Sequence, residues 1–120
     1  MRELTERIIG AAIEVHRYLG PGLLESLYEK ALCHELERRE IKFSSQVSVP
    51  VVYKNIVLGE HRLDLLVEDT VIVELKAVER IDPVFNAQLL GYLRLTQKKL
   101  GLLFNFNVPL LRDGISRIIL

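Results

Sequence analysis

Two segments with alternating side chains follow each other in residues 61–76, and they limit the possible folds more than any other feature. The second segment, residues 71–76, has valine or leucine at every odd position, while Glu74 and Lys76 occupy even positions. Alternation with a period of two is typical of β-strands, because successive side chains of a strand point to opposite faces. The stretch therefore predicts a β-hairpin with an apolar face and a charged face.

The length of the turn in this hairpin decides which charged side chains meet. If residues 68–70 form a three-residue turn, Asp64 lies opposite Glu74 on the same face. A two-residue turn would pair Asp64 with Val73 instead, because a shift of one residue moves every side chain to the other face. Both registers are compatible with the sequence.

In the first register, two carboxylates face each other across the strands, which disfavours folding because like charges repel. A divalent cation between Asp64 and Glu74 would remove this repulsion, since hard cations bind carboxylate oxygens. Lys76 would then direct its ammonium group at whatever the cation holds. The alternative is a solvated sheet face with mixed charges, which is common in globular proteins.

Length and composition restrict the class of protein. The chain has 120 residues, enough for one domain, which we expect to span residues 1–120. Its 16 basic and 16 acidic residues give a net charge of zero, which argues against coating nucleic acid through bulk charge. The single cysteine, Cys33, cannot form an internal disulfide, and no segment resembles a membrane span or a signal peptide. We therefore expect a cytoplasmic protein with no membrane association.

Helical and strand patterns follow each other in a defined order. Apolar residues at helical spacing predict helices over residues 3–19 and 23–39. Asp82-Pro83 predicts the start of a third helix that ends near Gln97, because aspartate caps helices and proline fits their first turn. Strands are predicted over residues 46–53, 56–67, 71–76, 101–106 and 115–120.

The order of two helices, three strands, one helix and two strands predicts the fold class. The first three strands should form an antiparallel meander, and the strand after the third helix should join by a right-handed crossover. The expected fold is α/β (α+β), with a mixed β-sheet flanked by helices. Pro50 predicts an edge strand or a bulge, because proline cannot donate a ladder hydrogen bond.

Two ionisable residues on the first two predicted helices each have two interpretations. Glu25 lies in a first helical turn, at the border of the apolar arc, and is either a site residue or a glutamate stabilised by the helix dipole. His16 lies at the edge of an apolar stripe, where a partly buried histidine with a local hydrogen bond is favoured over a ligand. The apolar stripe of the second helix is expected to consist of Leu24, Leu27, Tyr28, Ala31, Leu32 and Leu36.

Three features line up along the chain: an acid in a first helical turn, an Asp followed by Glu-x-Lys on adjacent strands, and Gln-x-x-x-Tyr on the next helix. In this order they resemble the PD-(D/E)xK nuclease superfamily. The segment from Gly22 through Glu25 to Tyr28 resembles the signature of the GxxExxY proteins, a bacterial and archaeal branch of it. One departure is Leu63, which stands where the name of the superfamily has proline.

The resemblance implies a restriction-endonuclease-like core and a role for each matching residue. Asp64 and Glu74 match the metal-binding acids, with the backbone carbonyl of Leu75 as a further ligand. Lys76 matches the lysine that orients or activates the attacking water. Glu25 matches the helix acid that helps to bind the metal directly or through water.

Three further residues are candidates for lining the site. Gln88 and Tyr92 lie four residues apart, so they share a helical face. By resemblance they match the pair that lines the site in exonuclease-type members. His16 is the third candidate.

The implied function is hydrolysis of phosphodiester bonds with Mg²⁺ (or Mn²⁺), and the expected partner is nucleic acid, with DNA as the substrate. The alternative is a non-catalytic module with a nuclease-like fold that binds nucleic acid or a partner protein. Zero net charge and small size support this alternative. A homodimer could supply a larger groove for a substrate.

Overall fold

The computed structural model describes residues 1–120, and its elements follow the order expected from the sequence. Two helices come first, three strands follow, and the last part contributes a helix, a short 3-10 turn and two strands. The elements are α1 (Arg2–Leu19), α2 (Glu25–Arg38), β1 (Phe43–Tyr53), β2 (Ile56–Val67), β3 (Val71–Lys76), α3 (Pro83–Thr96), β4 (Leu100–Asn105), η1 (Leu111–Gly114) and β5 (Ile115–Ile119).

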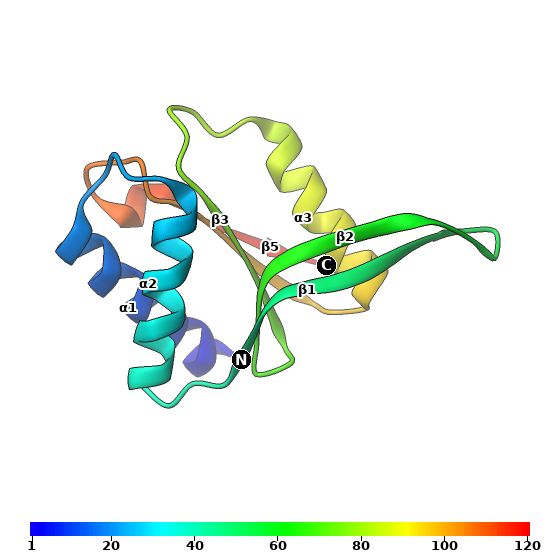
Figure 1. Ribbon diagram of the computed structural model, residues 1–120, viewed down its shortest axis with the longest axis horizontal. Coiled ribbons are helices and arrows are strands. Elements are labelled where there is room, and N and C mark those ends of the chain that lie inside the picture. Colours follow the sequence, from blue (N-terminus) through cyan, green and yellow to red (C-terminus); the bar gives the residue numbers. More distant parts are fainter.

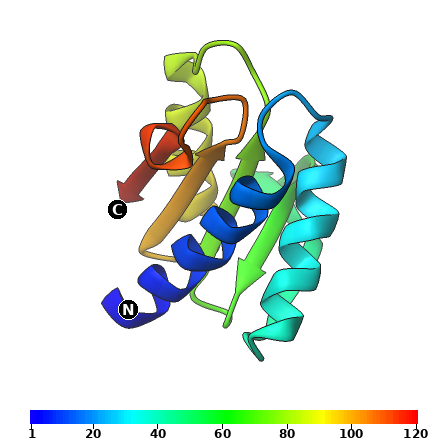
Figure 2. The ribbon, with the colours of Figure 1, turned by 90° about the vertical axis from the view of Figure 1, so that its left-hand side faces the viewer.

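The five strands form one mixed sheet in the order β1-β2-β3-β4-β5. Neighbouring strands pair antiparallel, except that β3 and β4 run parallel and are connected through α3. Helices α1 and α2 cover one face of the sheet, and α3 covers the other (Figure 2). The expected α+β fold is therefore confirmed. No helix combines the length and the apolar character needed to cross a membrane.

Each face of the sheet packs against its own apolar core. The larger core has 18 buried residues and lies under α1 and α2, where the Tyr28 ring stacks on Phe106 with centroids 4.5 Å apart. The smaller core has 6 buried residues and includes Leu89 of α3. Strand β3 enters both cores, Val73 the larger and Ile72 the smaller, because a central strand with helices on both sides is buried on both faces.

Strand β2 bends next to Asp64. Leu65 packs in the larger core, whereas Leu63 packs in the smaller core on the other face of the sheet. Residues two apart in a regular strand face the same side, so the chain rotates between these two positions. On β1, Gln46 lies at the same level and has a left-handed φ of 52°. Beyond the bend, β1 and β2 extend past α3 as a two-stranded hairpin (Figure 1).

The start of α2 differs from the expectation. The helix begins at Glu25 rather than at residue 23, and Leu24 is the extended residue before it. Leu24 and Leu27 are exposed instead of belonging to the apolar stripe, because the buried side of α2 begins only at Tyr28.

Strand β1 is longer than expected but has the predicted irregularity. It begins at Phe43 rather than at residue 46 and forms one edge of the sheet. Its pairing with β2 shifts register between Val51 and Val52, directly after Pro50. The prediction of an edge strand or bulge at this proline is confirmed in both respects.

Helix α3 approaches the sheet closely where β4 carries Gly101. A Cβ atom at position 101 would lie 2.8 Å from two side-chain carbons of Leu89, which is fully buried. Glycine therefore allows α3 to lie against β4, and this contact sets the distance between the helix and the sheet.

We expect Gly101→Ala to lower the free energy of unfolding by about 1–3 kcal/mol, because the added methyl group overpacks against Leu89. The matched control is Gly91→Ala in α3, where a Cβ atom meets nothing within 4 Å and alanine favours the helix. Urea unfolding of both variants measures the difference. Unchanged stability of Gly101→Ala would show that α3 can move away from β4 at no cost.

Candidate active site

The hairpin between β2 and β3 has the register that brings the two acids together. Val67 pairs with Val71, so residues 68–70 form the turn. The same register puts Asp64 level with Glu74. The three-residue turn is thus the correct one of the two alternatives that the sequence left open.

Asp64 and Glu74 are held by hydrogen bonds that cross between their strands. The backbone N–H of Asp64 donates to Glu74 Oε2 at 2.7 Å, and the N–H of Leu75 donates to Asp64 Oδ2 at 2.8 Å. Each carboxylate therefore occupies one oxygen with an amide of the other strand. These bonds keep the two acids side by side where β2 bends away from β3.

Burial makes this acid pair difficult to ionise. Glu74 is only 8% exposed, and burial together with the charge of Asp64 raises its pKa to about 8. Burial also raises the pKa of Asp64, although the Leu75 N–H and the Lys76 ammonium act in the opposite direction. Without a bound cation, the pair therefore holds a proton around neutral pH.

Lys76 lies beside the acids on the side of the sheet that α3 covers. Its Nζ lies 4.4 Å from the centroid of the Phe85 ring in α3, a cation–π contact. Its charge lowers the pKa of both Asp64 and Glu74. The ammonium group is thus fixed close to the acid pair without forming a direct ion pair with it.

Tyr92 and Gln88 lie one turn apart on α3. Partial burial raises the pKa of Tyr92, and the charges of Glu74 and Asp64 raise it further. The Tyr92 ring packs against His61 of β2, with centroids 5.3 Å apart. Gln88 is exposed. Tyr92 is thus electrostatically coupled to the acid pair, whereas the role of Gln88 in the site stays a prediction.

The loop before α2 makes Glu25 the first residue of that helix. Gly22 has a φ of 99°, a left-handed conformation that favours glycine. The Tyr28 hydroxyl donates to the carbonyl of Gly20 and accepts the N–H of Leu23 at 3.1 Å, so it clamps both sides of the turn. The spacing of Gly22, Glu25 and Tyr28 therefore has a structural reason: it builds the loop that presents Glu25.

Glu25 lies at the rim of the site. Its side chain is exposed, yet partial desolvation and the charge of Asp64 raise its pKa, and Lys76 lowers it. No group of three or more His, Cys, Asp or Glu side chains in the structure is arranged to hold a metal ion. The structure thus brings Asp64 and Glu74 into contact and leaves Glu25 within electrostatic range of them. Direct participation of Glu25 in metal binding stays a prediction.

The structure adds two residues to the site that the sequence interpretation missed. Glu29 lies one turn after Glu25 on α2, and both of its carboxylate oxygens accept from Gln46 Nε2, at 3.0 and 2.9 Å. Gln46 lies opposite Asp64 in the register of β1 and β2, and its side chain lowers the pKa of Asp64. The i, i+4 spacing could have indicated Glu29, whereas Gln46 becomes visible only once both strand registers are known.

His16 is a buried packing residue of α1. It is 6% exposed, and its Nε2 lies 2.8 Å from the Val108 carbonyl oxygen and 3.1 Å from that of Phe106. Because carbonyl oxygens only accept, Nε2 carries the proton. The interpretation as a buried histidine is confirmed, but the expected local hydrogen bond is wrong: helix packing supplies partners from the segment after β4.

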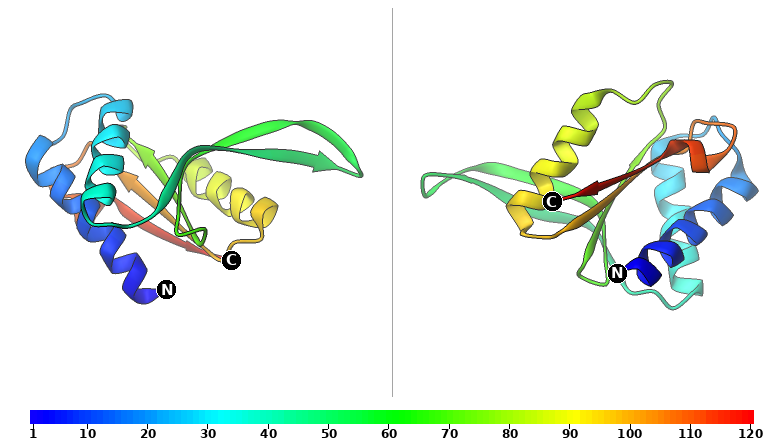
Figure 3. Two further views of the ribbon diagram at one scale, coloured as in Figure 1. Left: turned by 60° about the horizontal axis from the view of Figure 1, so that its bottom comes forward. Right: turned by 180° about the vertical axis from the view of Figure 1, so that it is seen from behind.

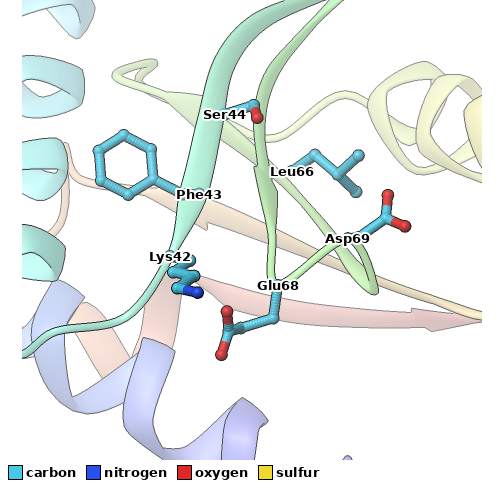
Figure 4. A pocket seen from close by; sticks show the side chains of 6 residues that line it. All are labelled: Lys42, Phe43, Ser44, Leu66, Glu68 and Asp69. Atoms are coloured by element: carbon cyan, nitrogen blue, oxygen red, sulfur yellow. The ribbon is translucent and has the colours of Figure 1, made fainter.

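His16 also borders a cavity of about 560 Å³ between the end of α1 and residues 109–112, and neither acid of the pair lines it. A second hollow of about 310 Å³ lies at the turn end of β2 (Figure 4). Its lining residues are Lys42, Phe43, Ser44, Leu66, Glu68 and Asp69. None of these is a predicted site residue, so neither hollow changes the assignment of the site to the strand bend.

Fold and site together define a class of protein. A mixed sheet with helices on both faces carries an aspartate and a Glu-x-Lys segment side by side on two central strands. This is the arrangement of a nuclease-like domain.

A family model described as the PD-(D/E)XK nuclease superfamily matches residues 2–118, so the chain belongs to this superfamily. No curated protein and no solved structure matches the chain. Divalent metal ions are generally used by nucleases of this superfamily.

We expect Glu74→Gln to be more stable than the parent above pH 8 in a chelator, with a difference that shrinks towards pH 5. The pKa of Glu74 rises from 4.5 to about 8 on folding, so between these values the folded state binds more protons than the unfolded state. Stability of the parent therefore falls as pH rises through this window. Glutamine keeps an acceptor oxygen and cannot titrate.

Thermal melts in a chelator at several pH values from 5 to 9 measure this difference. Glu79→Gln is the matched control, because Glu79 is an exposed loop residue. A difference between Glu74→Gln and the parent that does not depend on pH would contradict the prediction.

Proposed function

We propose that this protein is a metal-dependent nuclease that hydrolyses phosphodiester bonds in DNA. The contact between Asp64 and Glu74 beside Lys76 carries this proposal. Placing the buried Glu74 carboxylate next to the half-buried Asp64 carboxylate opposes folding, because both lose hydration and their charges repel. A non-catalytic scaffold has no need of such a pair, whereas a cation-binding site does.

The oxygen donors at the strand bend fit a hard divalent cation such as Mg²⁺ or Mn²⁺. The proposed ligands are the carboxylates of Asp64 and Glu74 and the backbone carbonyl of Leu75, with Glu25 joining directly or through water. The raised pKa of Glu74 supports this fit, because it marks a carboxylate whose charge is not compensated by the protein. When bound, such an ion would supply a lowered pKa of coordinated water and Lewis-acid polarisation of the phosphate.

The residues of the chain have separate roles in this proposal. Lys76, held over the Phe85 ring, provides a fixed positive charge where negative charge develops on the phosphate. The Tyr92 hydroxyl and the Gln88 amide are hydrogen-bond donors on the α3 side, suited to phosphate oxygens. Glu25 and its loop close the site from the α2 side.

We also infer that the chain belongs to the GxxExxY branch. Gly22, Glu25 and Tyr28 match its signature. The left-handed φ of Gly22 and the clamp made by the Tyr28 hydroxyl supply a physical reason for two of these three residues.

The second candidate function is a non-catalytic nuclease-fold module that binds nucleic acid or a partner protein. The lack of a preformed group of three metal-ligating side chains favours it, as does the zero net charge. A module of this kind would bind nucleic acid or protein without any requirement for a divalent ion.

Cleavage assays with single- and double-stranded DNA and RNA, in Mg²⁺ or Mn²⁺, distinguish the two candidates. We expect the parent to cleave DNA and Lys76→Ala to lose about 100-fold or more of this activity, because the lysine stabilises developing charge. Calorimetric titration with Mn²⁺ should show binding that Lys76→Ala retains and Asp64→Ala abolishes. A parent that binds no Mn²⁺ and cleaves no substrate would exclude the nuclease.

Gln88 provides a test of substrate positioning that is separate from stability. Gln88 is exposed, so Gln88→Ala should change the free energy of unfolding by less than about 0.5 kcal/mol while weakening cleavage. Its neighbour Leu89 is fully buried, and Leu89→Ala should cost about 2–5 kcal/mol. Urea unfolding and cleavage rates are measured on both variants. A Gln88→Ala protein with full activity would remove Gln88 from the site.

A further inference from the structure

The hairpin of β1 and β2 continues far beyond the sheet. Its end projects past α3, away from the other elements (Figures 1 and 3). Every residue from 52 to 62 is exposed. The turn at its tip has left-handed φ values of 47° at Lys54 and 70° at Asn55. We call residues 50–59 the arm.

The arm is apolar on both faces although it is surrounded by solvent. Val52 pairs with Val57 on one face, and Tyr53 pairs with Ile56 on the other. The most exposed large apolar side chains of the arm are Val52 (51%), Tyr53 (57%), Ile56 (61%), Val57 (66%) and Leu58 (64%). Lys54 is the only charged residue in the arm.

An arm of this composition is unfavourable in isolation. A two-stranded hairpin without further packing is marginally stable in water. Its apolar side chains also cost free energy in water, and an apolar patch of about 300–600 Å² is the size at which a surface is often a binding site. Another surface that covers the arm would remove both disadvantages.

The backbone of the arm is poorly suited to adding another strand at its β1 edge. Pro50 lacks an N–H group, and the register shift between Val51 and Val52 interrupts the regular spacing of donors and acceptors. The exposed apolar side chains stand on the faces of the arm, so a surface that removes them from water must pack against these faces.

We propose that a second copy of this chain covers the arm, with the two arms packed face to face in a symmetric homodimer. The five side chains offer about 500 Å² per copy over both faces, and face-to-face packing covers one face of each arm. Two copies therefore bury on the order of 500 Å² of apolar side chain, the range of a weak, concentration-dependent interface. A symmetric contact places the same patch on both partners, and only one charged residue per arm opposes it. Nucleic acid is a poorer partner, because a single lysine neutralises few phosphates.

This dimer would also join two candidate active sites. The arm continues the two strands that bend at Gln46 and Asp64, so an interface between arms connects two acid pairs through continuous strands. The inference does not depend on nuclease activity, since it follows from the exposed apolar surface alone.

Sedimentation velocity on the full chain, over a concentration range that extends to high micromolar, tests the proposal. The parent should shift from a monomer to a dimer of the 13.8 kDa chain as the concentration rises. Leu58→Lys should weaken association by about 10-fold or more, because two ammonium groups would enter the apolar interface. The matched control is Ile119→Lys on β5, a 75% exposed apolar residue outside the arm, which should leave the dimer intact.

Circular dichroism and thermal melts of each variant show whether it remains folded. Val57→Thr, which keeps a β-branched side chain, serves as a milder second variant that should also weaken the dimer. A parent that is monomeric at all concentrations overturns the proposal, as does a folded Leu58→Lys protein that dimerises like the parent. If Leu58→Lys instead alters DNA binding by a monomeric parent, the arm contacts nucleic acid and the homodimer is excluded.

Discussion

The structure depends on how the buried Glu74 carboxylate and the half-buried Asp64 carboxylate are accommodated where β2 bends away from β3. A buried carboxylate needs hydrogen-bond donors or a cation, and the bend supplies one backbone amide to each acid. Two amides do not compensate two charges, because the pKa of Glu74 still rises to about 8. Each acid of the pair therefore has a hydrogen-bond donor, but the negative charge of the pair is not neutralised. This combination identifies the bend as the candidate active site.

The remaining elements surround this bend from two sides. Helix α2 begins at Glu25 because Gly22 and Tyr28 shape the loop before it, which brings an additional acid to the rim. Helix α3 lies close to the sheet because Gly101 has no side chain, and so Tyr92 comes within electrostatic range of the acids. The site is thus assembled from both faces of the sheet, although its centre comes from a single hairpin.

The same bend has a second consequence for the molecule. It redirects β1 and β2 away from the sheet, so that the outer half of this hairpin is exposed on both faces (Figure 3). The outer part carries apolar side chains such as Val57 and Leu58 that would suit a protein interior. The exposed apolar arm and the uncompensated acid pair both lower the stability of an isolated chain. A second copy of the chain would cover the arm, and a divalent cation would neutralise the acid pair.

The sequence by itself determined the elements, their order, and the segment that carries the acid pair, because alternation, helical spacing and the Asp82-Pro83 start are local patterns. Tertiary structure selected the three-residue turn and thereby the contact between Asp64 and Glu74. It also decided the exposure of Leu24 and the partners of Gln46 and His16. These contacts join segments far apart in the chain, and they depend on strand registers and helix packing that no local pattern encodes.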